Sequence, residues 1–226
     1  MKKKILSLIF SAMLATGLTT SSNANIFEGL GVGFSVGTAG FYAEGEEKTD
    51  NQKVGEDMAK DGGAFQHDLG SIFIEYTAGP ITAGIDWNIE EINTPEATNM
   101  QFTGGSSNSQ VNLTNKVKAT FENHVTAYIM LPIWGGLYTK VGGMYVDIVT
   151  NESLATGGNY GNTDTTGWTA GLGFQHEVQD GFSIRGEVMG SRYEDVSVTN
   201  SANTSTSVHI TEMMGASAKF SVVKTF

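Results

Sequence analysis

Few side chains in this sequence belong to the types that usually carry out chemistry. Its 226 residues include four histidines and no cysteine, which excludes a thiolate nucleophile, a thiolate zinc site and a disulfide framework. His124 lies two residues from Glu122 and Thr126. His209 lies two residues from Ser207. Because residues i and i+2 share a face in any strand, such neighbours often arise by chance, and we predict no catalytic residue, no metal site and no cofactor.

Charged side chains inside largely apolar segments form a second group of residues that could carry out chemistry. Three acids and three bases fall on the polar faces of these segments, namely Glu75, Asp86, Lys140, Arg185, Glu187 and Lys219. An unpaired charge in a protein interior costs several kcal/mol. We therefore predict that the acids and bases pair with one another. Such a network is either a structural plug or the gate of a small ion path.

Eight segments must position these charges. In each of them apolar and polar residues alternate with a period of two, the pattern of a strand with one apolar face. The segments span residues 30–43, 71–77, 81–91, 117–130, 137–149, 167–178, 182–193 and 208–226. The sequence therefore predicts an all-β chain of eight antiparallel strands.

The connections between these segments also alternate. Three are tight and fall at 78–80, 132–136 and 179–181, whereas four are long and polar and fall at 44–70, 92–116, 150–166 and 194–207. Short turns at one end, long loops at the other and an even strand number are typical of a transmembrane β-barrel of the up-and-down type. A soluble β-sandwich is the alternative, because it too has one apolar face on each strand.

Two features favour the barrel over the sandwich. The polar face combines glycine, serine and charge, which suits the narrow interior of eight strands, filled by side chains. Aromatic residues near the segment ends resemble the girdles at membrane interfaces. We expect the girdle residues to be Tyr42, Tyr76, Trp134, Tyr138, Tyr145, Trp168, Phe182 and Phe226.

The N-terminus has the features of an export signal. Lys2, Lys3 and Lys4 precede the mostly apolar stretch 5–18, and small residues flank a cleavage site after Ala24. This predicts a signal peptide at 1–24, removed from a barrel domain at 25–226. The formal net charge of −11 is unfavourable for binding the negatively charged backbone of a nucleic acid. After residue 24 the sequence has no run of 18 apolar residues, so it predicts no membrane-spanning helix.

The C-terminus resembles the signal by which the barrel-assembly machinery recognises outer-membrane proteins. The last residue is Phe226, and Val222 and Phe220 precede it on one strand face. Lys224 departs from this pattern, where an apolar residue is usual, although a lysine at the membrane rim can extend its ammonium to the headgroups. The resemblance implies the assembly machinery as a partner.

The strands from about residue 117 resemble the OmpA-type eight-stranded transmembrane domain and the related opacity-like porin superfamily. The residues that carry the likeness are 137–144, 167–174 and 183–187. The resemblance implies a bacterial outer-membrane location, contact with outer-membrane lipid and lipopolysaccharide, and a structural or surface-interaction role. Comparable interior ion pairs in that family are proposed gates, so weak small-ion conduction is also implied.

Two other functions remain open at this point. One is an OmpW-like carrier of small hydrophobic molecules, which needs an apolar lumen or a lateral opening. An interior lined by Phe73, Tyr128 and Met144 with a cavity would favour it, and a packed charge network would favour the plug. The other is a lipid-modifying enzyme of the outer membrane. Long polar loops predict an extracellular ligand but do not identify it.

Overall fold

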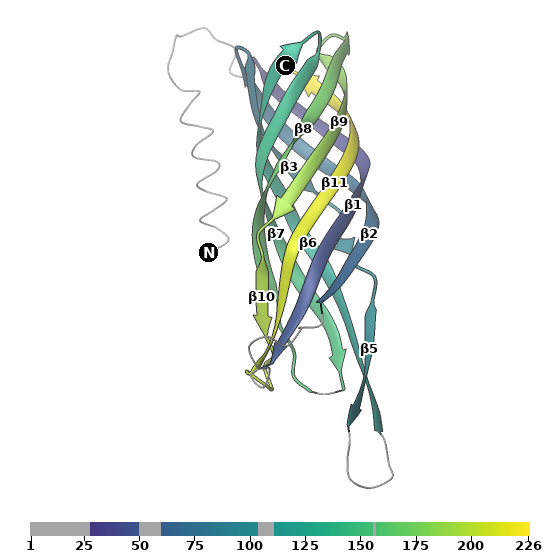
Figure 1. Cartoon of the computed structure of the whole chain (residues 1–226). Helices are drawn as coiled ribbons and strands as arrows, with labels where there is room; N and C mark the ends of the chain where they lie inside the picture. The colour runs from purple at the N-terminus through teal and green to yellow at the C-terminus, as the bar shows by residue number, and fades with distance from the viewer. Residues whose placement is uncertain (1–27, 50–59, 104–110, 156) are drawn as a thin grey trace.

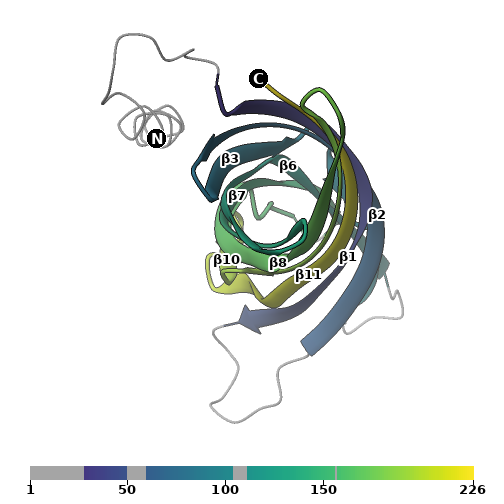
Figure 2. The same cartoon turned by 90° about the horizontal axis from the view of Figure 1, so that it is seen from above.

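A computed structural model describes residues 28–49, 60–103, 111–155 and 157–226. The predicted signal peptide and its cleavage site at Ala24 lie outside these residues. The described residues form eleven strands in one antiparallel sheet (Figures 1 and 2). The strands are β1 (Leu30–Thr49), β2 (Lys60–Ala78), β3 (Ile81–Asn88), β4 (Ile92–Asn93), β5 (Ala97–Thr103), β6 (Val111–Trp134), β7 (Leu137–Leu154), β8 (Thr163–Gln179), β9 (Phe182–Tyr193), β10 (Val196–Thr199) and β11 (Thr206–Thr225).

Eight of these strands close into a ring. The order around it is β1, β2, β3, β6, β7, β8, β9 and β11, and β11 pairs with β1 from Gly31↔Thr225 to Thr49↔Thr206. Viewed from its end, the sheet encloses a single interior (Figure 2). The prediction of an eight-stranded antiparallel up-and-down barrel is therefore confirmed. Within the described ranges, no helix is long and apolar enough to cross a membrane.

Three two-residue turns join strands at the end of the barrel where the C-terminus lies (Figure 1). They are Gly79-Pro80, Gly135-Gly136 and Asp180-Gly181. Each has a positive φ at its first residue, 59°, 57° and 43° respectively, which matches the twist of the flanking strands in tight hairpins. The tight connection expected at 132–136 is shorter than predicted, because Pro132 still pairs with Tyr138.

The long connections are shorter than the sequence suggested. Residues 44–49 and 60–70, expected in a loop, extend β1 and β2. Residues 97–103 and 111–116 form a hairpin of β5 and β6 that projects beyond the ring (Figure 1). Apolar residues are few in these extensions, so no sustained apolar alternation marks them as strands.

The outer face of the ring is apolar. The exposed side chains include Phe34, Val36, Ile72, Ile74, Ile129, Val141, Leu172, Phe174, Val188 and Phe220. Of the expected girdle, Tyr76, Trp134, Trp168, Phe182 and Phe226 are also exposed. Tyr138 is a correction, because it is only 4% exposed and points inward. It lies two residues before Lys140, so the period of two already placed both on one face.

Candidate functional site in the barrel lumen

Arg185 anchors the layer of the interior nearest the short turns. Its guanidinium binds both carboxylate oxygens of Glu75, at 2.7 and 3.0 Å. It also donates to Gln175 Oε1 at 2.8 and 3.1 Å, and the Tyr128 hydroxyl donates to Glu75 at 2.7 Å. Arg185 is 1% exposed and Glu75 is 5% exposed. This bidentate geometry is the strong form of an arginine–carboxylate pair.

Lys140 and Glu187 form a second ion pair across the interior. The Lys140 ammonium lies 3.1 Å from both carboxylate oxygens of Glu187, and the Tyr138 hydroxyl donates to Glu187 at 2.7 Å. Lys140 Nζ also lies 4.0 Å from the centroid of the Tyr128 ring. The two tyrosines therefore tie the first ion pair to the second.

Lys219 and Asp86 form the third pair. Lys219 Nζ lies 3.2 Å from Asp86 Oδ2 and 3.4 Å from Ser71 Oγ. Ser71 in turn shares a hydrogen bond of 2.5 Å with Ser35. All six charged residues singled out from the sequence therefore lie in the interior, and each acid contacts one base. Because the pairs carry no net charge and their charged atoms are partnered, burying them in the lumen costs less than burying unpaired charges would.

Inward-facing glycines make room for the aromatic rings of this layer. A Cβ at Gly84 would collide with the Tyr128 ring, one at Gly173 with the Tyr138 ring, and one at Gly33 with Phe73. Each ring thus lies over a glycine on the neighbouring strand. This packing compensates for the side chain that glycine lacks in a sheet. The sequence showed which face the charges occupy but not their partners, because partners depend on the stagger of the strands around the ring.

An apolar cluster fills the interior toward the long loops. Its buried members are Ile148, Val196 and Met213, from β7, β10 and β11. Side chains of β1, β6 and β9 pack against them, among them Phe121 and Tyr193. Six strands contribute side chains to this cluster, which is here called the upper cluster.

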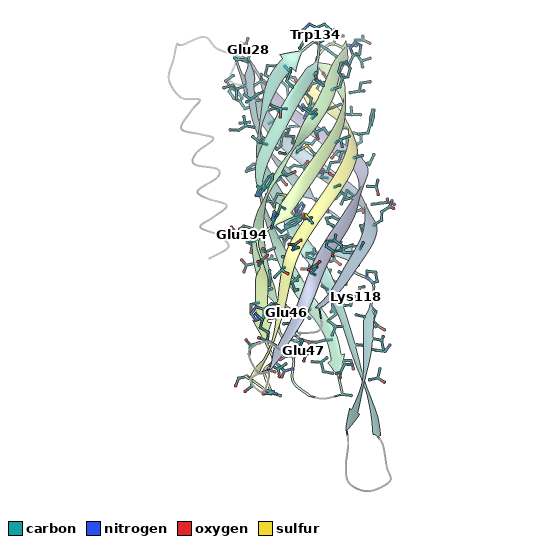
Figure 3. All side chains as sticks on the ribbon, in the orientation of Figure 1. Glu28, Glu46, Glu47, Lys118, Trp134 and Glu194 are labelled. Atoms are coloured by element: carbon teal, nitrogen blue, oxygen red, sulfur yellow. The ribbon has the colours of Figure 1, made fainter. Side chains whose placement is uncertain are left out.

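Backbone contacts brace the long-loop end beside the upper cluster. The Ser201 amide donates to Asn159 O at 2.8 Å, and the Asn159 amide donates to Ser201 Oγ at 2.9 Å. Tyr160 N donates to Glu152 at 2.7 Å. Burial and the nearby charge of Glu47 raise the pKa of the Tyr160 hydroxyl. Glu46 and Glu47 mark this end in Figure 3, whereas Glu28 and Trp134 mark the other.

Two small cavities lie between the ionic layer and the upper cluster. The first, of about 50 Å³, touches Lys140, Glu187, Asp86 and Lys219. The second, of about 40 Å³, is lined by apolar side chains such as Ile92, with His124 and Tyr193 also on its wall. Since His124, Tyr193, Phe41 and Ile92 line both, the cavities adjoin.

The ring is hydrogen-bonded less completely toward the long loops. β2 pairs with β3 only from Ser71 to Ala78, and its residues 60–69 have β1 on one side and no strand on the other among the described residues. β4 and β5 instead pair with β6. A seam therefore separates β2 from β4, and the 40 Å³ cavity reaches Phe65 on one flank and Ile92 on the other.

His124 and His209, which have polar neighbours two residues away in the sequence, differ in whether they contact those neighbours. A β-bulge between Glu122 and Val125 interrupts the alternation beside His124, and His124 Nε2 instead contacts the Tyr193 hydroxyl at 3.2 Å. His209 Nε2 does lie 3.1 Å from Ser207 Oγ. In the described part of the chain, no group of three His, Asp or Glu residues could hold a metal ion.

Comparison with known proteins identifies the fold. No protein-family model matches the sequence, and no curated protein matches it. The chain is similar to the outer membrane protein OprG from Pseudomonas aeruginosa, with 14% identity, 88% of this chain and 97% of OprG covered, and a TM-score of 0.52. It has the fold of a bacterial outer-membrane β-barrel.

Two further solved structures are more distant. The outer membrane protease OmpT from Escherichia coli is 10% identical over 92% of this chain and 100% of OmpT, with a TM-score of 0.48. Neisserial surface protein A is 11% identical over 85% of this chain and 97% of that protein, with a TM-score of 0.37.

Proposed function

We propose that this chain is an integral outer-membrane barrel whose lumen is held closed by ion pairs and conducts small ions only when these pairs separate. Its long loops then supply a structural or surface-interaction role, in contact with lipopolysaccharide. The apolar outer face supports the membrane location, since lipid must solvate it. Membership of the OmpA-type family is part of the proposal and rests on the strand motifs at 137–144 and 167–174.

The observation that carries the proposal is the set of three ion pairs in the lumen, two of which are tied together by Tyr128 and Tyr138. Arg185 lies at the centre of the first pair and is 1% exposed, so the layer leaves little room for water around it. Salt bridges can exchange partners without breaking the barrel, because the surrounding strands are hydrogen-bonded independently of them. A plug of this kind is therefore able to open without unfolding.

Replacement of Glu187 tests the gate. Glu187→Ala removes the carboxylate that holds both Lys140 and the Tyr138 hydroxyl, so we expect a several-fold rise in the open probability of single channels in planar bilayers. Glu177→Ala is the matched control, because Glu177 is an exposed residue at the short-turn mouth. Unchanged conductance in an inserted Glu187→Ala barrel would leave a structural plug and remove the ion path.

The apolar cavity at the seam favours a second candidate, the OmpW-like carrier of small hydrophobic molecules. Met144 lines the neighbouring cavity, as this function requires, but Phe73 and Tyr128 pack within the ionic layer. A carrier would therefore use the seam between β2 and β4 rather than the full length of the lumen, and the 40 Å³ cavity would have to widen at this seam, because a cavity that binds benzene holds roughly 150 Å³.

NMR contacts with a short alkane test the carrier. Ile92 is 2% exposed and lines the cavity, whereas nearby Ile89 is 56% exposed on the outer face. A carrier is expected to give nuclear Overhauser effects from the alkane to the Ile92 methyls, and Phe65→Trp is expected to weaken them by filling the cavity. Contacts to Ile89 alone would argue against this function.

A further inference from the structure

Arg192 is a base on the outer face of the barrel. The outward side chains of β9 include Ile184 and Val188, whereas Arg185 and Glu187, at the alternate positions, face the lumen. Arg192 shares the outward positions and is exposed. No ion pair in the described part of the chain involves its guanidinium. A direct counter-ion for this arginine must therefore come from outside the described residues.

The strand register places Arg192 in a row with two aromatic side chains. Trp168 lies directly opposite it on β8, and Met214 lies opposite it on β11. Tyr42 of β1 in turn lies opposite Met214. Because directly opposite residues of antiparallel strands share a face, these four side chains, here called the Arg192 row, lie together on the outer face. Tryptophan and tyrosine favour the interface between membrane and water.

The Arg192 row separates an apolar part of the outer face from a polar part. Toward the short turns, Leu172 and Val188 lie opposite each other and are exposed. Toward the long loops, the next outward side chains are polar and include Thr166, Glu194 and Glu44. The row therefore marks the edge of the apolar band.

The height of the row agrees with the thickness of a membrane. β9 begins at Phe182, directly after a short turn, and Arg192 lies ten residues further along the same strand. At about 3.3 Å per residue and a strand tilt of about 40°, this distance is about 25 Å along the barrel axis, the usual height of the apolar band. Because the long loops of such barrels are extracellular, the row lies at the headgroups of the outer leaflet.

A hollow in the apolar face adjoins the Arg192 row. It has a volume of about 500 Å³, and Tyr42 and Met214 of the row line it together with Gly40, Ala64 and Ala216. Gly40 lies opposite Ala216, and a Cβ at Gly40 would meet no atom within 4 Å, so the space above this glycine is open. Lipid chains surround this face, and one that enters the hollow gains packing contacts on several sides.

Three carboxylates lie near the row on its polar side. Glu194 and Glu44 each accept a hydrogen bond of 2.7 Å from a hydroxyl of the protein. Glu212 lies in the bulge of β11. None of the three forms an ion pair with Arg192 within the described residues. They repel an anion, so an anion at Arg192 is expected to bind best with Mg²⁺ present, because oxygen anions are its ligands.

We propose that the Arg192 row and the hollow bind one molecule of lipopolysaccharide, with a phosphate of its lipid anchor on the Arg192 guanidinium and an acyl chain in the hollow. The guanidinium presents a planar fork of N–H donors that matches a phosphate. Met214 lines the hollow and lies one strand, about 4.8 Å, from Arg192, so one lipid reaches both. The inference specifies the lipopolysaccharide contact proposed above and rests on it, but it does not depend on ion conduction.

Lipid retention in native mass spectrometry tests the site. The barrel in detergent with Mg²⁺ is titrated with the diphosphorylated lipid anchor of lipopolysaccharide, with the same lipid after removal of its phosphates, and with phosphatidylglycerol. We expect one diphosphorylated lipid per barrel and at least about tenfold weaker retention of the other two, because a hydrogen bond to a charged group contributes about that factor or more. Equal retention of either of the other two lipids would overturn the proposal.

Substitutions of Arg192 separate this site from the general lipopolysaccharide contact. Arg192→Gln is expected to weaken retention about 10–100-fold, and Arg192→Lys to weaken it less, since lysine keeps the charge but not the fork. Lys118→Gln is the matched control, because Lys118 lies nearer the long-loop end than Glu194 (Figure 3), and it is expected to bind like the wild type. Equal weakening by Lys118→Gln would mean that net charge alone acts and would overturn the site.

Filling the hollow tests the acyl chain. Gly40→Leu is expected to weaken retention several-fold, whereas Gly186→Leu on the outer face of β9, where a Cβ also meets no atom within 4 Å, is expected not to. If Gly40→Leu does not fold, Ala216→Leu replaces it. Unchanged retention by a folded Arg192→Gln or hollow-filling barrel would overturn this inference alone. Absent retention of every lipid by the wild type would overturn the proposed lipopolysaccharide contact as well.

Discussion

Arg185 shows at the scale of the residue how strongly the lumen depends on complete pairing. The variant Glu75→Gln keeps the shape of the side chain but leaves the guanidinium without its counter-charge. We expect it to lower the free energy of unfolding by about 3–5 kcal/mol, the usual cost of an uncompensated buried charge. Urea titration of the barrel in lipid vesicles measures the loss, and Glu177→Gln at the exposed mouth is expected to stay within about 0.5 kcal/mol.

A second substitution distinguishes the charge from the contact. Adding Arg185→Met to Glu75→Gln removes the unpaired guanidinium, so the double variant is expected to recover most of the lost stability. Further destabilisation by Arg185→Met would mean that packing of the arginine, rather than its charge, holds this layer. The alternation in the sequence placed both residues in the lumen, but their pairing across the barrel, with 110 positions between them, depends on the strand stagger.

At the scale of the element, the short hairpins set the register that aligns these charges. Gly136 in the β6–β7 turn has φ 90°, and a Cβ there would lie 2.5 Å from Gln175 O. Gly136→Ala is therefore expected to lower the free energy of unfolding by about 1–3 kcal/mol. Gly143→Ala on β7 is the control, because a Cβ there meets no atom within 4 Å. Equal stability of the two variants would show that the turn does not constrain the hairpin.

Strand bounds could be predicted best where one face of the strand meets lipid and the other faces the packed lumen. Strand β9 has the predicted bounds, 182–193, because lipid outside and a packed lumen inside impose strict alternation on it. Toward the long loops this strict alternation is lost, as in the sequence of residues 60–69 and 97–103. The bulge beside Asn123, with φ 52°, reverses the inward face of β6, so that Phe121 and His124 both contribute to the 40 Å³ cavity.

At the scale of the whole molecule, the proposed closure of the lumen has two parts in series, the ionic layer and the upper cluster. Only the first closure could be predicted, because charged residues within apolar strands are conspicuous in a sequence. The second consists of ordinary apolar residues such as Ile148 and Met213. The alternation puts them on the same face as Lys140 and Lys219, but nothing in the sequence shows that they meet one another across the lumen. An ion that crosses the barrel must pass both closures.

Two closures in series make a quantitative prediction about conduction. If each opens independently, the open probability of the path is the product of the two separate probabilities. Met213→Ala, which leaves a cavity in the upper cluster, is then expected to raise the open probability on its own. Combined with Glu187→Ala, the two increases are expected to multiply in planar-bilayer recordings. Increases that merely add would indicate two parallel routes, only one of which passes the ionic layer, and would argue against two closures in series.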